Sequence, residues 1–95
     1  MRGLAIVAVL LTSPAHANAV ERACIAAGRA PERELCTCIG VAAQLTLNDR
    51  DQRIAAEFFS DPQAAQDTRM SDRRRDEAFW QRYLSFGQMA EDMCG

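Results

Sequence analysis

Lysine is absent from this chain of 95 residues, and its single histidine, His16, lies near the amino terminus. Without lysine, the chain has no residue for Schiff-base chemistry and no lysine for a phosphate-binding loop. The five glycines form no Gly-x-Gly-x-x-Gly motif. If His16 is removed with a leader, triads with an imidazole base and zinc sites with nitrogen ligands are excluded too. We therefore expect a protein that is not an enzyme and that has no metal or cofactor.

Residues 1–19 are typical of a cleavable signal peptide. Met1-Arg2 is a short basic start, and Gly3 to Leu11 is an apolar run that is too short to span a bilayer. Ala15-His16-Ala17 and Ala17-Asn18-Ala19 are both small-x-small patterns of the kind that a signal peptidase accepts. We therefore expect cleavage after Ala17 or Ala19 and a periplasmic or secreted product. Residues 20–95 then form one domain without a membrane span.

No large excess of either charge is present. The chain has eleven arginines against thirteen acidic residues, for a formal net charge of −2. Loss of Arg2 with the leader makes this charge slightly more negative. A slightly acidic domain gives no electrostatic reason to expect nucleic acid or an anionic membrane as a partner.

All four cysteines, Cys24, Cys36, Cys38 and Cys94, lie in the expected domain. An even number of cysteines in a small exported chain predicts disulfides, here two. Pro31 and the acids that follow it predict the start of a helix that carries Cys36 and Cys38. Residues two positions apart on a helix point to nearly opposite sides and cannot bridge to each other. Each of this pair should therefore bond to Cys24 or to Cys94.

The segment around Cys24 predicts a short helix from Val20 to Ala27, ended by Gly28. A turn between Gly28 and Pro31 would fold this helix back antiparallel on the next one. The midpoint between Cys24 and Cys36 falls in that turn, which favours these two cysteines as one pair and leaves Cys38 for Cys94. The swapped pairing, in which Cys24 bonds to Cys38 and Cys36 to Cys94, is only slightly less favoured and stays open.

Helical spacing continues along the rest of the chain. The second helix should end near Leu47, and its apolar stripe consists of Leu35, Cys38, Ile39, Ala42 and Leu45. Asn48 is a good N-cap for a third helix, which has Asp49 and Asp51 in its first turn. The expected core face of this third helix consists of Ile54, Ala55, Phe58 and Phe59.

Two further capping signals divide the carboxyl-terminal half. Asp61 and Pro62 begin a polar helix that is short or runs on past Met70, and Ser71-Asp72 precedes a final helix that reaches Cys94. The apolar side of the final helix consists of Phe79, Tyr83, Phe86, Ala90 and Met93, broadened by Trp80 and Leu84. No stretch alternates with the two-residue period of a strand. The sequence predicts an all-α fold, a small disulfide-stapled bundle of four or five short helices.

The run Arg73, Arg74 and Arg75 is a candidate contact surface together with Trp80. Acidic neighbours flank the run, and Arg73 has the i,i+4 spacing of a helical ion pair with Glu77, so a self-compensated surface is the favoured interpretation. The aromatic cluster around Trp80 is favoured as core. An indole is nevertheless too large to bury fully here, and Trp80 is therefore placed at the edge of a contact surface.

Several stretches of the chain resemble a group of small exported four-cysteine proteins of alphaproteobacteria. They are Glu21-Arg22-Ala23-Cys24, Leu35-Cys36-Thr37-Cys38-Ile39, Ser60-Asp61-Pro62-Gln63-Ala64-Ala65-Gln66, Phe79-Trp80-Gln81-Arg82-Tyr83 and the closing Cys94. Some members of the group carry the name "arginine transporter", which implies a link to arginine transport. A domain of this size cannot form a permeation path, so the resemblance implies at most binding for this chain.

We expect a binding or structural accessory that uses a helix surface to contact another envelope protein. One alternative is binding of arginine or another small molecule, linked to transport. A second alternative is a thiol-redox or copper-binding protein that uses Cys36 and Cys38, because two soft thiolates can hold Cu(I) or exchange disulfides. Structural disulfides are favoured over this second alternative, since each of the two cysteines has a partner elsewhere.

Overall fold

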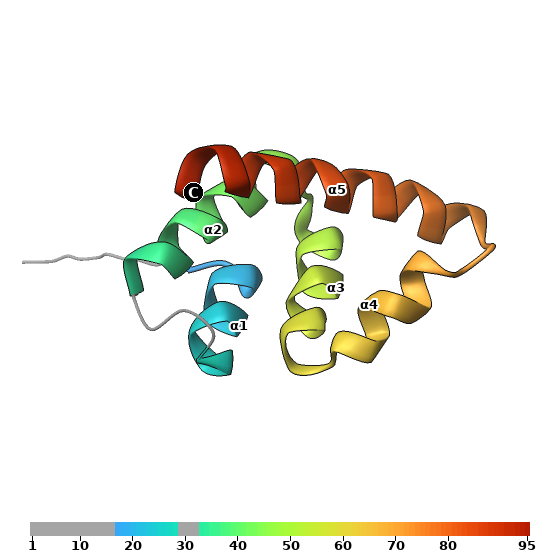
Figure 1. The fold of residues 1–95 in the computed structure, drawn as a ribbon, viewed down its shortest axis with the longest axis horizontal. Helices are drawn as coiled ribbons and strands as arrows, with labels where there is room; N and C mark the ends of the chain where they lie inside the picture. Colours follow the sequence, from blue (N-terminus) through green and yellow to red (C-terminus); the bar gives the residue numbers. More distant parts are fainter. Residues whose placement is uncertain (1–16, 29–32) are drawn as a thin grey trace, which may run out of the picture.

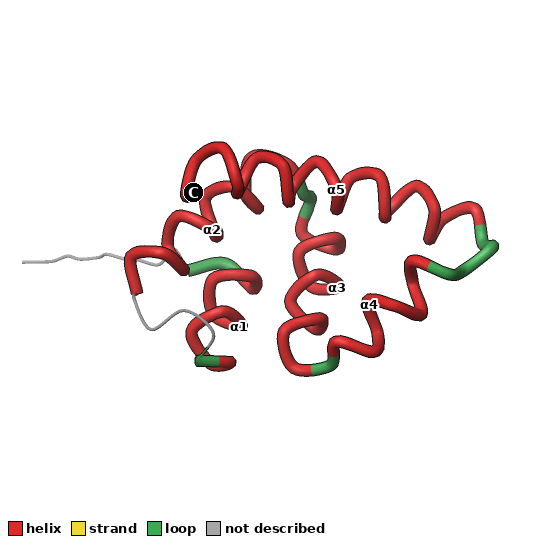
Figure 2. Tube along the Cα trace, in the orientation of Figure 1, coloured by secondary structure: helices red, strands yellow, loops and turns green. Residues whose placement is uncertain are grey.

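A computed structural model describes residues 17–28 and 33–95. Within these residues the chain forms five helices and no strand: α1 (Ala19–Ala27), α2 (Arg33–Thr46), α3 (Asp49–Ser60), α4 (Pro62–Arg69) and α5 (Arg74–Cys94). Figure 2 shows that short loops connect the helices from α2 onward. The predicted all-α fold with two disulfides is confirmed. The expected leader and the predicted helix start at Pro31 fall largely or wholly outside the described residues.

The longest helix, α5, runs along one edge of the molecule (Figure 1). Helix α2 packs antiparallel against the carboxyl-terminal half of α5, and α1 packs against both α2 and α3. Helix α4 returns from the end of α3 to the start of α5 and contacts both of these helices. The core therefore lies where α1, α2, α3 and α5 meet, and it consists of Val20, Ala42, Ala43, Leu47, Ala55, Phe58, Phe79 and Phe86.

Helix α1 has a well-defined beginning and end. Asn18 is its N-cap, and the Oδ1 atom accepts a hydrogen bond of 2.9 Å from the backbone N–H of Glu21. Gly28 follows the last turn with a φ of 65°, the left-handed conformation that favours glycine at a helix carboxyl end. The predicted helix over Val20 to Ala27 is therefore present, and it begins one residue earlier.

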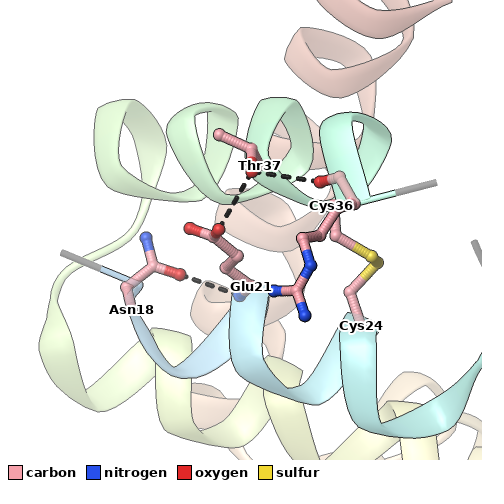
Figure 3. The surroundings of a disulfide bond; sticks show 6 residues. Asn18, Glu21, Cys24, Cys36 and Thr37 are labelled. Carbon is pink, nitrogen blue, oxygen red and sulfur yellow. Dashed lines mark hydrogen bonds between the residues drawn. A yellow bond between two sulfur atoms is a disulfide. The ribbon is translucent and has the colours of Figure 1, made fainter. Parts of the chain in front are cut away.

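Helices α1 and α2 approach each other closely at Gly40. The amide Nδ2 of Asn18 donates a hydrogen bond of 2.8 Å to the carbonyl of Gly40, and the Thr37 hydroxyl donates one of 3.0 Å to Oε2 of Glu21 (Figure 3). A Cβ atom at Gly40 would lie 2.8 Å from Cβ of Glu21. Because that neighbouring atom is attached directly to the α1 backbone, a side chain at residue 40 would push the two helices apart.

Gly40→Ala should therefore lower the free energy of unfolding by about 1 to 2 kcal/mol, since the cost of overpacking exceeds the gain in helix propensity. Gly87→Ala is the matched control, because a Cβ there meets no described atom within 4 Å and the residue is also helical. This control should be neutral or more stable than the parent. Chemical unfolding followed by the fluorescence of Trp80 measures both. Equal effects of the two substitutions would contradict a close approach at Gly40.

The disulfides join α2 to two different helices. Cys24 of α1 bonds to Cys36 with a Cα–Cα distance of 5.6 Å (Figure 3), and Cys38 bonds to Cys94 of α5 with a Cα–Cα distance of 5.9 Å. This is the pairing that the sequence argument favours. The two-residue spacing explains why Cys36 and Cys38 bond to different helices, because residues two positions apart face opposite sides and each side of α2 meets a different helix. The two bonds thus hold α2 between α1 and α5.

The apolar stripes are less completely buried than the sequence predicts. Leu45, Leu84 and Met93 are exposed, whereas Ala42 is buried and Ile39 packs against the core. Leu45 shares one side of α2 with the exposed Val41, one turn earlier, whereas Ala43 and Leu47 are buried, so the covered side of α2 is not the one that carries Leu45. None of the described helices covers the sides of α5 that carry Leu84 and Met93.

Two capping predictions need correction. Asp61 occupies the N-cap position of α4, but its side chain makes no capping hydrogen bond. Helix α5 begins at Arg74 rather than directly after Ser71-Asp72. Ser71 still orders the approach to α5, because its Oγ accepts a hydrogen bond from the N–H of Arg73 and donates one of 2.6 Å to Oδ2 of Asp76. The turn between α4 and α5 is therefore fixed by a side chain two residues before the N-cap. The polar helix that begins at Pro62 is short and does not run on past Met70, since α4 ends at Arg69.

Candidate functional site

Asp51 is a fully buried carboxylate that the sequence analysis assigned to an ordinary first helical turn. Its side chain is 0% exposed, and the guanidinium of Arg82 donates two hydrogen bonds to it, Nε to Oδ2 at 2.5 Å and Nη2 to Oδ1 at 3.1 Å. These hydrogen bonds raise the pKa of the Arg82 guanidinium above its ordinary value. The pair joins α3 to α5, so the carboxylate is already satisfied and is not available to a ligand.

A signal for the buried position of Asp51 is present in the sequence. Asp51, Ala55 and Phe58 have the i, i+4, i+7 spacing of a single helix face, and the last two were assigned to the core. The neighbouring Gln52 is also buried, and its Nε2 donates a hydrogen bond of 3.0 Å to the carbonyl of Leu47. Which arginine would meet Asp51 could not be read from the sequence, because Arg82 is 31 residues away.

The aromatic side chains of α3 and α5 form one cluster. Tyr83 lies at its centre, with ring centroids 5.2 Å from Phe58, 5.8 Å from Phe79 and 5.0 Å from Trp80. Phe79 is buried, and Tyr83 and Trp80 are half-buried. The cluster is therefore mainly core, as the sequence favours, and the indole of Trp80 lies at its edge. Burial raises the pKa of the Tyr83 phenol, because the phenolate loses solvation.

Alkaline titration should show this burial directly, because Tyr83 is the only tyrosine. The folded protein keeps the phenolic proton at a pH where the unfolded chain, with an ordinary pKa of 10.0, has lost it. The free energy of unfolding should therefore fall as the pH rises from this ordinary value through the raised one. Tyrosinate absorbance of the folded and the urea-unfolded protein measures both pKa values. In Tyr83→Phe the absorbance step must disappear, and equal pKa values in the two states would contradict burial.

An open groove of about 500 Å³ lies at the turn between α4 and α5. Its wall contains Trp80 and Arg74, which the sequence analysis proposed as part of a contact surface, and Arg69 of α4, which it did not. The remaining lining residues are Ser71, Glu77, Ala78 and Gln81. Arg73 and Arg75 do not line the groove. The structure therefore brings one of the three consecutive arginines to Trp80 and adds a second arginine from another helix.

The sequence favours a surface on which the consecutive arginines pair with their acidic neighbours, and the structure does not show this pairing. Among the described residues, the ion pairs join Asp51 to Arg82 and Arg50, and Arg73 forms none with Glu77. Arg74 is exposed at the first position of α5. Arg69 is exposed at the last position of α4, and only a long contact of 3.5 Å joins its guanidinium to Gln66. Two arginines are therefore accessible beside a half-buried indole, which is a combination suited to binding a carboxylate-bearing chain.

The cysteines are not free thiols. All four are in disulfides, and Cys36 and Cys38 face different helices. Within residues 17–28 and 33–95, no three carboxylate, thiol or imidazole groups gather closely enough to hold a metal ion. None of the five described helices combines the length and the apolar character that crossing a membrane requires.

Comparison with known proteins identifies no relative: no protein family, no curated protein and no solved structure matches this chain.

Proposed function

We propose that this protein is a non-enzymatic binding accessory that contacts another envelope protein through the groove between α4 and α5. The observation that carries the proposal is the position of half-buried Trp80 beside Arg69 and Arg74 in one open groove. Tryptophan and arginine are the residues in which the binding energy of protein interfaces is concentrated. The packing of Trp80 against Tyr83 and the hydrogen bonds of Ser71 with Arg73 and Asp76 hold the α5 side of the groove in place before a partner arrives.

Charge reversal at the groove tests this proposal. Arg74→Glu should weaken capture of a partner from envelope extract by about tenfold, which corresponds to about 1.4 kcal/mol. Arg33→Glu is the matched control, because Arg33 is the first residue of α2 as Arg74 is of α5, and it is exposed and does not line the groove. In both variants an acid enters a first helical turn, where it does not destabilise the helix. A partner that both variants capture equally well would contradict a contact at the groove.

The proposal includes export from the cytoplasm. Two disulfides in a small domain are typical of an oxidising compartment. The contacts of Asn18 favour cleavage after Ala17, because cleavage after Ala19 would remove both the N-cap of α1 and the hydrogen bond to the carbonyl of Gly40.

The exported protein should therefore begin at Asn18, and amino-terminal sequencing of the periplasmic fraction checks this. An amino terminus at Val20 would contradict cleavage after Ala17, and a protein that keeps its leader would contradict export.

Asn18→Ala should lower the free energy of unfolding by about 1 kcal/mol, the usual value of an N-cap.

The two alternative functions make different demands on the structure. Binding of arginine needs carboxylates that are free to receive a guanidinium, whereas Arg82 already occupies the buried carboxylate of Asp51. Thiol or copper chemistry at Cys36 and Cys38 needs both disulfides to be open. Calorimetric titration with arginine should give no heat, and the purified protein should show no free thiol. Either signal would favour the corresponding alternative over a protein contact.

A further inference from the structure

The two disulfides lie in different environments. Cys24 and Cys36 are 1% and 0% exposed, so no reagent can reach their bond without separating α1 from α2. Cys38 and Cys94 are both only half-buried. Cys94 also lines an open groove at the end of α5, together with Leu35, Ile39, Gly87, Ala90, Glu91 and Gly95. Accessible disulfides are the ones that exchange readily with thiols.

We propose that the bond between Cys38 and Cys94 is a thiol-exchange site, which a small thiol or dithiol opens while the bond between Cys24 and Cys36 stays closed. This inference is independent of the proposed contact at the α4–α5 groove. An incoming thiolate attacks Sγ of Cys94, a mixed disulfide forms there, and Cys38 leaves as a thiolate that takes up a proton. A second thiolate then attacks the sulfur of the incoming group in the mixed disulfide and releases Cys94. The thiol is oxidised to its disulfide, and the two cysteines are reduced.

The groove that Cys94 lines is open at Gly87, which is part of the same wall. A Cβ at Gly87 would meet no described atom within 4 Å, so the space above this residue is open. Residue 87 lies seven residues, or about two helical turns, before Cys94, so both are on the same side of α5. A small thiol can therefore reach Cys94 along an open side of α5.

The geometry of α2 keeps the opened state from rearranging. Cys38 points away from Cys36, because the two residues are two positions apart on one helix. A thiolate at Cys38 therefore cannot attack the bond between Cys24 and Cys36, and oxidation restores the original pairing. Opening the bond frees the last turn of α5 from α2 and uncovers Leu35 and Ile39, which line the same groove. The bond between Cys38 and Cys94 is thus a reversible covalent link between α2 and the last turn of α5.

Stepwise reduction of the oxidised protein with dithiothreitol tests the proposal. Samples are alkylated at intervals, and peptide mass spectrometry locates the labels. A species with two labels, on Cys38 and Cys94, should accumulate first, and it should keep its helical circular dichroism. Labels that appear first on Cys24 and Cys36, or on all four cysteines together, would overturn the proposal.

Discussion

Arg82→Ala should lower the free energy of unfolding by about 3 kcal/mol, because it leaves the buried carboxylate of Asp51 without its two hydrogen bonds and with only Arg50, 4.0 Å away, as a counter-ion. Asp51 is 0% exposed, and a buried charge that loses its partner keeps the full cost of desolvation. The Arg82 side chain is 43% exposed, so the pair is partly open to solvent and the effect lies at the lower end of the range for buried pairs. Urea unfolding followed by the fluorescence of Trp80, the only tryptophan, measures it.

Arg75→Ala is the matched control for this prediction. Arg75 lies in the first turn of the same helix, is exposed, and forms no ion pair with a described residue, so its removal should change stability by less than about 0.5 kcal/mol. The double variant Asp51→Ala/Arg82→Ala should lose less free energy of unfolding than the sum of the losses in the two single variants. In the double variant neither charged side chain is left without the other. Strictly additive losses would contradict a direct contact between Asp51 and Arg82.

Removal of the longer disulfide, in Cys38→Ala/Cys94→Ala, should lower the free energy of unfolding by about 4 kcal/mol. The bond spans 56 residues of sequence, and the unfolded chain gains entropy when this long loop opens. Both cysteines are half-buried, so alanine leaves little cavity and the loss is mainly that of loop closure. A domain of this size has a total stability of about 5 to 10 kcal/mol, so the variant should remain folded at room temperature with a sharply lower melting temperature.

Thermal and guanidinium unfolding of this variant, followed by circular dichroism, provide the measurement. The parent protein with both bonds intact is the reference. A loss below about 1 kcal/mol would mean that the unfolded chain is compact even without the bond, so that cross-linking removes little entropy.

The local structure could largely be predicted from the sequence. Asn48 as the N-cap of α3, Pro62 as the first residue of α4 and Gly28 as the end of α1 are all present, because each depends on backbone groups only a few residues away. The favoured cysteine pairing is also the one in the structure. Its basis was local as well, since it rests on the two-residue spacing of Cys36 and Cys38 and on a short turn.

Predictions that depended on how helices cross were less accurate. The sequence did not indicate that Leu45 would be exposed, that α5 would begin at Arg74, or that the groove would combine Arg74 with Arg69. Asp51 was assigned only to the first turn of the third helix, although its spacing from Ala55 and Phe58 places it on the core face. A carboxylate is ordinarily exposed, and the hydrogen bonds from Arg82 offset the desolvation cost of burying Asp51.

The amino-acid sequence by itself determined that this protein is helical, where most of its helices begin and end, and that its four cysteines supply two cross-links. Helix periodicity, caps and cysteine spacing act over short distances along the chain, which is why they are readable there. Only the tertiary structure decided that Arg82 satisfies Asp51, that Trp80 lines one groove with two arginines, and that one disulfide is buried while the other borders a groove. Each of these depends on contacts between residues that are distant in sequence, and such contacts are set by the angles at which packed helices cross.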